Sequence, residues 1–503
     1  MTADEAIALI RDGDTVGLVG GGGGLCEATT LHQAVERRWL AEGHPRGITA
    51  LHALGIGDRD KRGMNCFAYE GLVKRVIGGH WVWSPRMQQL AAEEKIEAYV
   101  LPGGVVMQLL REIAAGRPGL FTHVGLGTFA DPRQEGGRLN ASATEPLVEV
   151  AEIDGRELLR YRPFPIHVAL LKGSKADAEG NVSLDEEPAN VDIYAMAAAA
   201  HNSAGKVIVQ VRELVDTGSL PARAVRIPGA LVDAVVVDPD QRQSYEIPYD
   251  PSLSGQERRP VPPADKPPFD IRQVIARRAR DELTPGAVIN YGFGIPDAVA
   301  ALVEAAGETG LYYQTIEHGT YGGALLTGQL FGYARNPTAM IDAPSQFDFY
   351  SGGGLDIAFL GFGEIDAQGN ANASKLGGLT VGPGGFVDIA QNARKLVLCG
   401  TFDAKGARIT PGGGRLTIDA HGQIPKFVDR VAQITFSGTY AAEHGQQVVY
   451  VTERAVFSLT PEGLRLDEIA PGLDLSRDIL DRMAFRPLIP SELRLMDAAY
   501  FTE

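Results

Sequence analysis

The sequence carries one plan twice, and this internal repeat limits the chain to folds with two related halves. An apolar run enters a glycine cluster in GDTVGLVGGGGG (13–24), and PGAVINYGFGIPDAVAALVEA (285–305) repeats that order later in the chain. Likewise, IHVALLKGSKADAEGNVSL (166–184) parallels LDIAFLGFGEIDAQGNANA (355–373), each with an apolar run before D-A-x-G-N. We therefore predict two related domains.

A polar, proline-rich segment, residues 245–270, separates the two copies. It shows no sustained hydrophobic period, and proline stiffens such segments, so we predict an exposed linker. The predicted domains are then an N-terminal domain, residues 1–244, and a C-terminal domain, residues 271–503. A chain of 503 residues is too long for a single hydrophobic core, which agrees with this division.

Short continuous apolar runs in both halves predict strands that are buried on both faces. HVALL (167–171) and DAVVVD (233–238) are bounded by glycine or charged residues, which is typical of parallel sheets covered by helices. Amphipathic patterns such as QQLAAEEKIEAY (88–99) predict the helices between them. The predicted fold class is α/β, with two related, open and mostly parallel sheets.

The C-terminal tail has a different pattern. Residues 447–472 alternate strand-forming runs with the turns T-E-R and P-E-G, which predicts a β-meander. A helix is expected near LSRDILDRM (475–483), with Asp474 or Ser476 as its N-cap.

Composition argues against several classes of function. A net charge of −16 disfavours nucleic acid and anionic membranes as partners. No apolar run approaches the ~20 residues needed to span a bilayer, and the acidic N-terminus lacks a signal-peptide pattern. Cys26, Cys66 and Cys399 are few and far apart, which fits a reducing cytoplasm. Without a CxxC, HxH or HxxxH pair, we expect no metal site.

Two glycine-rich loops are candidate ligand sites. Gly20–Gly24 lies between a predicted strand and a helix, as phosphate-binding loops do, but the G-x-G-x-x-G spacing is not distinctive within a glycine run. Gly382–Gly385 offers backbone N–H groups suited to an oxyanion or a cofactor phosphate. A tight turn between strand and helix explains each loop equally well.

Glu317 stands where the strand-like run YYQTI meets a glycine cluster. A single glutamate at a strand end is usually solvated, so the residue by itself does not indicate a reacting group. His318 beside it is a candidate general base, although a histidine next to glycine is more often a structural hydrogen-bonding group. No Ser-His-Asp set or G-x-S-x-G elbow accompanies them.

Taken together, the motifs of the whole chain resemble family I coenzyme A transferases, and most closely those that act on propionate and acetate. In chain order the matching segments are DGDTV (12–16), GHW (79–81), PGLFTHVGLGTFADPRQEGG (118–137), FPIHVALLKGSKAD (164–177), YDPSLSGQERRP (249–260), Glu317-His318-Gly319 with Gly322-Gly323, QFDFYSGGGLD (346–356), GPGGF (382–386), AQNARKLVLCGTF (390–402) and EIAPGLDL (468–475). The nucleophile of this family is the glutamate of an E-x-G motif in the second half, which corresponds to Glu317.

The resemblance implies a ping-pong transfer of CoA from a short-chain acyl-CoA to a free acid of the acetate, propionate or butyrate type, through a glutamyl-CoA thioester. The residues implied in oxyanion or CoA binding are Gly382, Gly384, Gly385 and Gln346. Those implied in walling an acyl pocket between the domains are Gly22, Gly23, Gly24, Gly103 and Gly104.

The same resemblance indicates the partners of the chain. They are acyl-CoA and short-chain carboxylic acids, with CoA as a substrate and no permanently bound cofactor. Members of the family are usually dimers or tetramers, so we expect a cytoplasmic homodimer or homotetramer.

Two positions depart from the family pattern. Cys26 stands where close relatives carry proline, and Gly103 replaces the glutamine of their P-Q-G or S-Q-G motif. Both positions are expected near the acyl pocket, so the departures predict altered acyl specificity, with a larger or differently shaped acid, and leave the reaction class intact.

Three alternative functions remain open at the level of sequence. An acyl-CoA hydrolase would use the same glutamate with water as acceptor, and it would release free acid without an acceptor acid. A non-catalytic metabolite-binding module would have no need of a carboxylate nucleophile. A dinucleotide oxidoreductase would bind NAD(H) tightly, which the Gly20–Gly24 run alone does not support.

Overall fold

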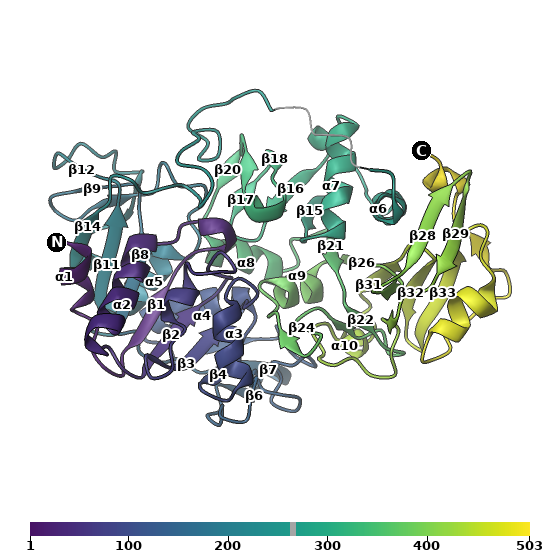
Figure 1. The fold of residues 1–503 in the computed structure, drawn as a ribbon, viewed down its shortest axis with the longest axis horizontal. Helices are drawn as coiled ribbons and strands as arrows, with labels where there is room; N and C mark the ends of the chain where they lie inside the picture. Colours follow the sequence, from purple (N-terminus) through teal and green to yellow (C-terminus); the bar gives the residue numbers. More distant parts are fainter. Residues whose placement is uncertain (262–267) are drawn as a thin grey trace.

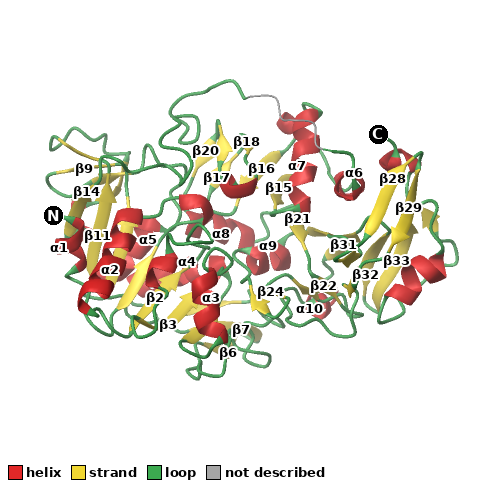
Figure 2. Cartoon of the chain, in the orientation of Figure 1, coloured by secondary structure: helices red, strands yellow, loops and turns green. Residues whose placement is uncertain are grey.

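The computed structural model describes residues 1–261 and 268–503, so residues 262–267 of the predicted linker lie outside the described residues. Figure 1 shows the N-terminal half, purple to teal, beside the C-terminal half, green to yellow, and Figure 2 shows the strands of both halves in yellow, with one large sheet in each half. The α-helices of the described residues are α1 (Ala3–Ile7), α2 (Thr29–Glu42), α3 (Pro85–Ala92), α4 (Gly103–Ala114), α5 (Ile193–Asn202), α6 (Ile271–Arg280), α7 (Ile295–Ala305), α8 (Ala343–Ser351), α9 (Phe386–Asn392) and α10 (Gly438–Glu443).

The large sheet of the N-terminal half is parallel throughout. In spatial order its strands are β14 (Ala234–Val237), β11 (Lys206–Val211), β8 (Val168–Lys172), β1 (Thr15–Leu18), β2 (Ile48–His52), β3 (Val73–Gly78) and β4 (Glu97–Val100). Every residue of β1 and β8 is buried, as continuous apolar runs predict for the centre of a parallel sheet.

The large sheet of the C-terminal half has a parallel centre, formed by β16, β15, β21, β26 and β31. Its flanks pair antiparallel, except for the parallel edge pair β33–β34. In spatial order its strands are β20 (Ala339–Met340), β17 (Thr320–Tyr321), β16 (Tyr313–Ile316), β15 (Val288–Tyr291), β21 (Ile357–Gly361), β26 (Lys395–Cys399), β31 (Gln447–Val451), β32 (Ala455–Thr460), β33 (Gly463–Ile469) and β34 (Arg494–Leu495). The antiparallel run β31–β32–β33 is the predicted meander. The α/β fold class, with two mainly parallel sheets, is therefore confirmed.

Smaller sheets extend both halves. Their strands include β5 (Leu120–Thr122), β6 (Val148–Ile153), β7 (Arg156–Tyr161), β9 (Lys175–Asp177), β10 (Val182–Ser183), β12 (Glu213–Val215), β13 (Val225–Ile227), β18 (Ala324–Leu325), β19 (Ala334–Arg335), β22 (Glu364–Ile365), β23 (Ala371–Asn372), β24 (Lys375–Leu376), β25 (Leu379–Thr380), β27 (Asp403–Ala404), β28 (Arg408–Gly412), β29 (Arg415–Ala420) and β30 (Ile424–Pro425).

The two D-A-x-G-N motifs form the same turn, one in each half. The Asp177 carboxylate accepts hydrogen bonds from the backbone and the side-chain amide of Asn181, and Asp366 does the same with Asn370. The glycine between them has a positive φ in both copies, 84° and 76°. Because aspartate and glycine dictate this turn locally, the repeat visible in the sequence survives in the structure.

The described part of the predicted linker is not uniformly exposed. Residues 255–261 are exposed, but Pro251–Leu253 are buried. The carbonyl of Ser252 accepts a hydrogen bond of 2.7 Å from the Asn336 N–H, and Asp250 pairs with Arg335 at 2.9 Å. The expectation of an exposed segment is therefore wrong for these residues, because they pack against the β18–β19 region of the C-terminal half.

Two local predictions can be compared directly with the structure. The helix expected over residues 88–99 ends at Ala92, because Glu94 has a positive φ of 57° and the chain continues into β4. The Asp474 side chain accepts from the Arg477 N–H and caps the next helical turn, Leu475–Ile479, which is a π-helix.

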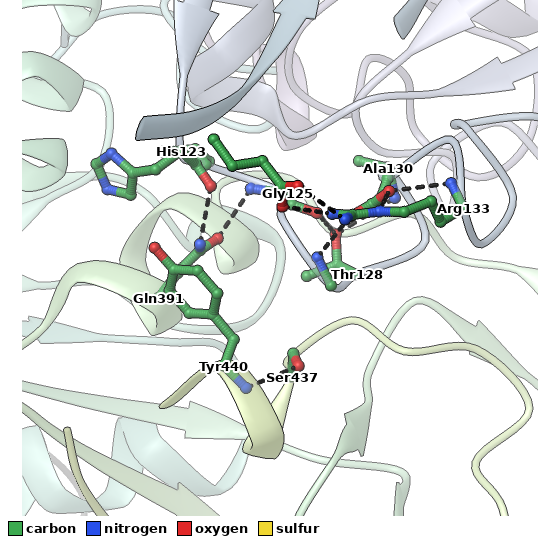
Figure 3. Close-up of polar contacts among 12 residues, drawn as sticks. His123, Gly125, Thr128, Ala130, Arg133, Gln391, Ser437 and Tyr440 are labelled. Atoms are coloured by element: carbon green, nitrogen blue, oxygen red, sulfur yellow. Dashed lines mark hydrogen bonds and ion pairs between the residues drawn. The ribbon is translucent and has the colours of Figure 1, made fainter. Parts of the chain in front are cut away.

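Helix α9 joins the two halves at the middle of the molecule, where α4 of the N-terminal half packs against α8 and α9 (Figure 1). Its last turn is held by the loop that follows β5. The Gln391 side chain accepts from the Gly125 N–H at 2.8 Å and donates to the His123 carbonyl at 2.9 Å (Figure 3). Asn392 hydrogen-bonds the His123 ring at 2.6 Å. These contacts fix α9 relative to the N-terminal half.

Replacing Gln391 by leucine tests this contact. The Gly125 N–H and the His123 carbonyl would lose their partner, so we expect Gln391→Leu to lower the free energy of unfolding by about 1–3 kcal/mol. Urea unfolding followed by circular dichroism measures the change. The matched control, Gln89→Leu, is on an exposed position of α3 and should stay within about 0.5 kcal/mol of wild type. Equal effects of the two substitutions would contradict the role of Gln391.

Candidate active site

A cavity of about 490 Å³ lies between the two halves, and Glu317 is part of its wall. Residues of the N-terminal half that line it include Gly22, Leu25, Leu54, Gly55, His80 and Trp83. Residues of the C-terminal half that line it include Phe293, Phe331, Phe362, Leu376, Gly382 and Gly384. The wall is therefore mainly apolar and aromatic, with one carboxylate, as is usual for small-molecule sites.

Glu317 directly follows β16 and is half-buried. Its carboxylate faces the Gly382–Gly385 loop, since a Cβ on Gly385 would lie only 2.2 Å from Glu317 Oε2. Burial raises the pKa of Glu317 from its ordinary 4.5 to about 7, and the backbone N–H of Gly385 offsets part of this rise. The carboxylate is thus partly desolvated and partly ionised near neutral pH, which suits a nucleophile.

Asp388 is a second buried carboxyl group near Glu317. It lies in the first turn of α9, where one of its oxygens accepts from the Gly104 N–H at 3.1 Å and the other has no partner. Burial raises the pKa of Asp388 to about 8, the Gly104 N–H opposes this rise, and the Glu317 charge adds to it. Asp388 is therefore mostly protonated at neutral pH, which limits repulsion of the Glu317 carboxylate.

The backbone N–H groups of the Gly382–Gly385 loop have different partners. The Gly382 N–H donates to the Ser374 carbonyl at 3.0 Å, and the Gly384 N–H donates to the Gly79 carbonyl at 2.9 Å. Neither group is free for an oxyanion in this conformation. The Gly385 N–H is directed at Glu317, so of the three predicted glycine donors the geometry favours Gly385, whereas Gly382 and Gly384 line the cavity.

Gln346 is completely buried in α8 and does not line the cavity. Its amide lies beside the hydroxyls of Tyr321 and Tyr350, but neither amide atom has a hydrogen bond of good geometry. A buried amide without a partner is costly, and the role of Gln346 as a side-chain donor stays a prediction.

His318 is buried and lines the same cavity as Glu317, but its ring is engaged in a structural hydrogen bond. Its Nε2–H donates to the Gly332 carbonyl. Burial lowers the pKa of His318 to about 4, and the bond to Gly332 offsets part of that shift. His318 is thus neutral and anchors the 327–332 loop, in agreement with the structural reading of the sequence.

Of the glycines expected in an acyl pocket, only Gly22 lines the cavity. A Cβ on Gly23 would lie 2.2 Å from the Gln329 carbonyl oxygen, and one on Gly24 would lie 2.8 Å from the Tyr245 nitrogen. Gly103 and Gly104 contact α9 and its preceding loop, with a Cβ on Gly103 2.9 Å from the Gly384 carbonyl carbon. These four glycines allow close packing of backbone and do not face the cavity.

Cys26 also lies outside the cavity wall. Its thiol is buried and donates to the Ala189 carbonyl at 3.3 Å. Its φ is 52°, whereas a proline ring fixes φ near −65°, so proline at this position would require a different backbone conformation. Neither Cys26 nor Gly103 lines the cavity, so neither shapes its wall directly, and their effect on acyl specificity stays a prediction.

Sequence reasoning missed several residues of the site. Trp83, Arg59 and His80 line the cavity from the N-terminal half, and Asp388 lies just beyond the glycine loop. His80 belongs to the GHW segment and Trp83 follows it closely, but no local pattern separates these side chains from core residues. That these residues belong to one site follows only from the three-dimensional arrangement of the loops of the two halves.

Within residues 1–261 and 268–503, no group of three or more His, Cys, Asp or Glu side chains is arranged to hold a metal ion. Over the same ranges, every helix is too short or too polar to cross a bilayer.

Comparison with known proteins places this site in a family. Residues 1–238 match the family model described as Coenzyme A transferase. The chain is 42% identical to the acetate CoA-transferase YdiF of Escherichia coli (strain K12), over 100% of this chain and 95% of that protein. It is 43% identical to the caffeate CoA-transferase of Acetobacterium woodii, over 100% of this chain and 97% of that protein.

A solved structure matches the fold over the same length. The acyl-CoA transferase of E. coli O157:H7, crystallised as a thioester complex with CoA, has a TM-score of 0.94 and 42% identity, and the match covers 100% of this chain and 95% of that chain. The chain therefore belongs to the coenzyme A transferase family. It is a CoA-transferase enzyme, as the resemblance of its motifs indicated.

The pKa of Glu317 makes a prediction about stability. Because the folded-state pKa, about 7, exceeds the ordinary value of 4.5, the native state keeps its proton where the unfolded chain has lost it. The stability that this group contributes is fully present below about pH 4.5 and is lost as the pH rises through about 7. Glu317→Gln removes this titration, so wild type should lose stability relative to the variant over that range.

Urea unfolding of both proteins from about pH 5 to about pH 8 measures the difference. The gap should widen in favour of the variant up to about pH 7 and then level off. A pH-independent gap would show that the carboxyl group titrates normally.

Proposed function

We propose that this chain transfers CoA from a short-chain acyl-CoA to a free carboxylic acid of the acetate, propionate or butyrate type, with Glu317 as the nucleophile. The observation that carries the proposal is the partly desolvated Glu317 carboxylate, held against the Gly385 N–H in an apolar cavity between the halves. The acid type is supported by the similarity to an acetate CoA-transferase over the full chain.

In the first half-reaction, a Glu317 carboxylate oxygen attacks the thioester carbon of the acyl-CoA. The C–S bond breaks, CoA leaves as a thiolate, and an acyl-glutamyl anhydride remains. A thiol with a pKa of about 8.5 is an adequate leaving group at neutral pH. The thiolate then attacks the glutamyl carbonyl carbon, which breaks the bond to the bridging oxygen and releases the first acid.

The resulting glutamyl-CoA thioester reacts with the acceptor acid by the same steps in reverse. The acceptor carboxylate attacks the glutamyl carbon and expels CoA thiolate, which then attacks the acceptor carbonyl and frees Glu317. The crystallisation of a relative as a thioester complex with CoA supports this covalent intermediate. Because the first acid leaves before the second binds, the kinetics are ping-pong.

Each attack produces a tetrahedral oxyanion that needs hydrogen-bond donors. The Gly385 N–H is the proposed backbone donor, because it already faces the reacting carboxylate. The buried, unpartnered amide of Gln346 is the proposed side-chain donor. Donors fixed in advance in a dry site are worth several kcal/mol to such a step.

We retain several sequence predictions as part of the proposal. The division into residues 1–244 and 271–503, a homodimer or homotetramer, cytoplasmic localisation and the absence of a permanently bound cofactor all remain predictions. They agree with the proposed reaction, in which CoA is a substrate and no metal is required.

Intact mass spectrometry tests the proposed nucleophile. When the protein is mixed with propionyl-CoA and quenched, we expect a mass increase equal to bound CoA, and borohydride should remove it by reducing the thioester. Glu317→Ala should form no adduct and should lose transfer activity, because the variant has no carboxylate to acylate. Asp388→Asn, which keeps a neutral group at the neighbouring position, should still form the adduct.

Two outcomes would contradict the proposal. One is unchanged turnover in Glu317→Ala. The other is a glutamyl-CoA adduct that water hydrolyses to free CoA and the Glu317 carboxylate at the rate of turnover without any acceptor acid, which would identify an acyl-CoA hydrolase.

A further inference from the structure

The residues that line the cavity differ in exposure, which we use to define an open end and a closed end, and Glu317 belongs to the same wall. In the C-terminal half, Phe293 and Leu376 line the open end and are 52% and 39% exposed. In the N-terminal half, Leu25, Leu54 and Trp83 line the other end and are 9% exposed or less. The charged nucleotide of CoA must stay in water, so its pantetheine arm enters at the open end and the acid occupies the closed end.

The Trp83 indole is fixed at this closed end by two glycines. A Cβ on Gly22 would lie 2.2 Å from Trp83 Cε2, and a Cβ on Gly55 would lie 2.4 Å from Trp83 Cδ1. The ring therefore occupies the space that side chains would take at both positions. The exposed Arg59 places its guanidinium 4.5 Å from the ring centroid, and the Arg59 N–H donates to the Trp83 carbonyl at 3.0 Å. The indole therefore packs against the backbone at both glycines and against the Arg59 guanidinium.

His80 lies between the nucleophile and this indole. The position of a Cβ on Gly384 lies 3.9 Å from Glu317 Oε1 and 3.8 Å from His80 Cδ2. The position of a Cβ on Gly55 lies 2.7 Å from His80 Nδ1 and 2.4 Å from Trp83 Cδ1. His80 is therefore next to Trp83 on one side and to the Glu317 region on the other. An acid whose carboxyl carbon reaches Glu317 thus directs its tail along His80 toward Trp83.

We propose, on the basis of the transfer reaction proposed above, that Trp83 is the residue that limits the length of the acid. Its indole forms a fixed apolar wall together with Leu25 and Leu54. The substrates it admits are compact monocarboxylic acids with an apolar tail. Acids with longer acyl chains would collide with the indole, whose position is fixed by its packing against two glycines.

Two substitutions should change the acid profile in opposite directions. Trp83→Leu shortens the wall, so kcat/KM for hexanoate relative to acetate should rise by about tenfold or more, since each methylene accommodated is worth about that factor. Gly55→Ala forces the indole toward the cavity, the one side left open to it, and should lower the same ratio. Gly55 has no positive φ, so alanine fits its backbone. Steady-state kinetics with straight-chain acids from acetate to hexanoate measure both ratios.

A control at the open end separates length selection from general damage. Phe293→Leu alters the entry of the pantetheine arm, so it should change the KM for acyl-CoA and leave the ratio between the acids unchanged. Trp83→Phe is a smaller change, and it serves as the test if Trp83→Leu disturbs folding. Its ratio of kcat/KM for hexanoate to that for acetate should lie between the ratios of wild type and Trp83→Leu.

The outcomes distinguish the two proposals. If Trp83→Leu and Trp83→Phe form the glutamyl-CoA adduct but keep the wild-type acid ratios, the assignment of Trp83 is wrong and the transfer mechanism stands. If Gly55→Ala raises the hexanoate ratio, the direction assigned to the indole is wrong. If wild type itself forms no adduct, the proposed function fails first.

Discussion

Backbone hydrogen bonds between the two halves fix the loop that faces Glu317, and the geometry of the site depends on them. The Trp81 N–H donates to Val381 at 2.7 Å, the Gly384 N–H to Gly79 at 2.9 Å, and the Gly103 N–H to Gly384 at 2.7 Å. Such close approach of two chains requires glycine, because a Cβ would collide with the opposite backbone. The same bonds use the N–H of Gly384 and so leave Gly385 to face the nucleophile.

The site holds two carboxyl groups that are buried and only partly ionised. Glu317 and Asp388 are two neighbouring carboxyl groups whose pKa values burial raises to about 7 and about 8. Because the pKa of Glu317 is the lower of the two, Glu317 is the more ionised group near neutral pH, while Asp388 keeps its bond to the Gly104 N–H. This arrangement costs stability, as is common at active sites, and gives a carboxylate that water solvates poorly and that is therefore more nucleophilic.

The parts of the structure that follow from local chemistry could be predicted from the sequence. The D-A-x-G-N turns, the buried strands and the C-terminal meander depend on nearby residues, and each is found where the pattern placed it. The resemblance of the motifs to a known family predicted that Glu317 and the Gly382–Gly385 loop belong to one site. Long-range packing was not predictable: the glycine at position 23 is required by the carbonyl of Gln329, and Gly103 by the backbone of Gly384. For the same reason the role of Trp83 could not be predicted, since the two glycines that pack against its indole are distant from it in sequence.

If Glu317 is the nucleophile, its carboxylate exchanges an oxygen with each acid that the enzyme converts. In the proposed steps, the acceptor acid leaves one of its oxygens on Glu317, and the next acid to be released carries that oxygen away. Turnover with an acceptor acid labelled with oxygen-18 in its carboxylate, followed by mass spectrometry of the peptide that contains Glu317, measures this directly. We expect label in the Glu317 side chain and, after further turnover, in the released acid. An unlabelled Glu317 after many turnovers would contradict it.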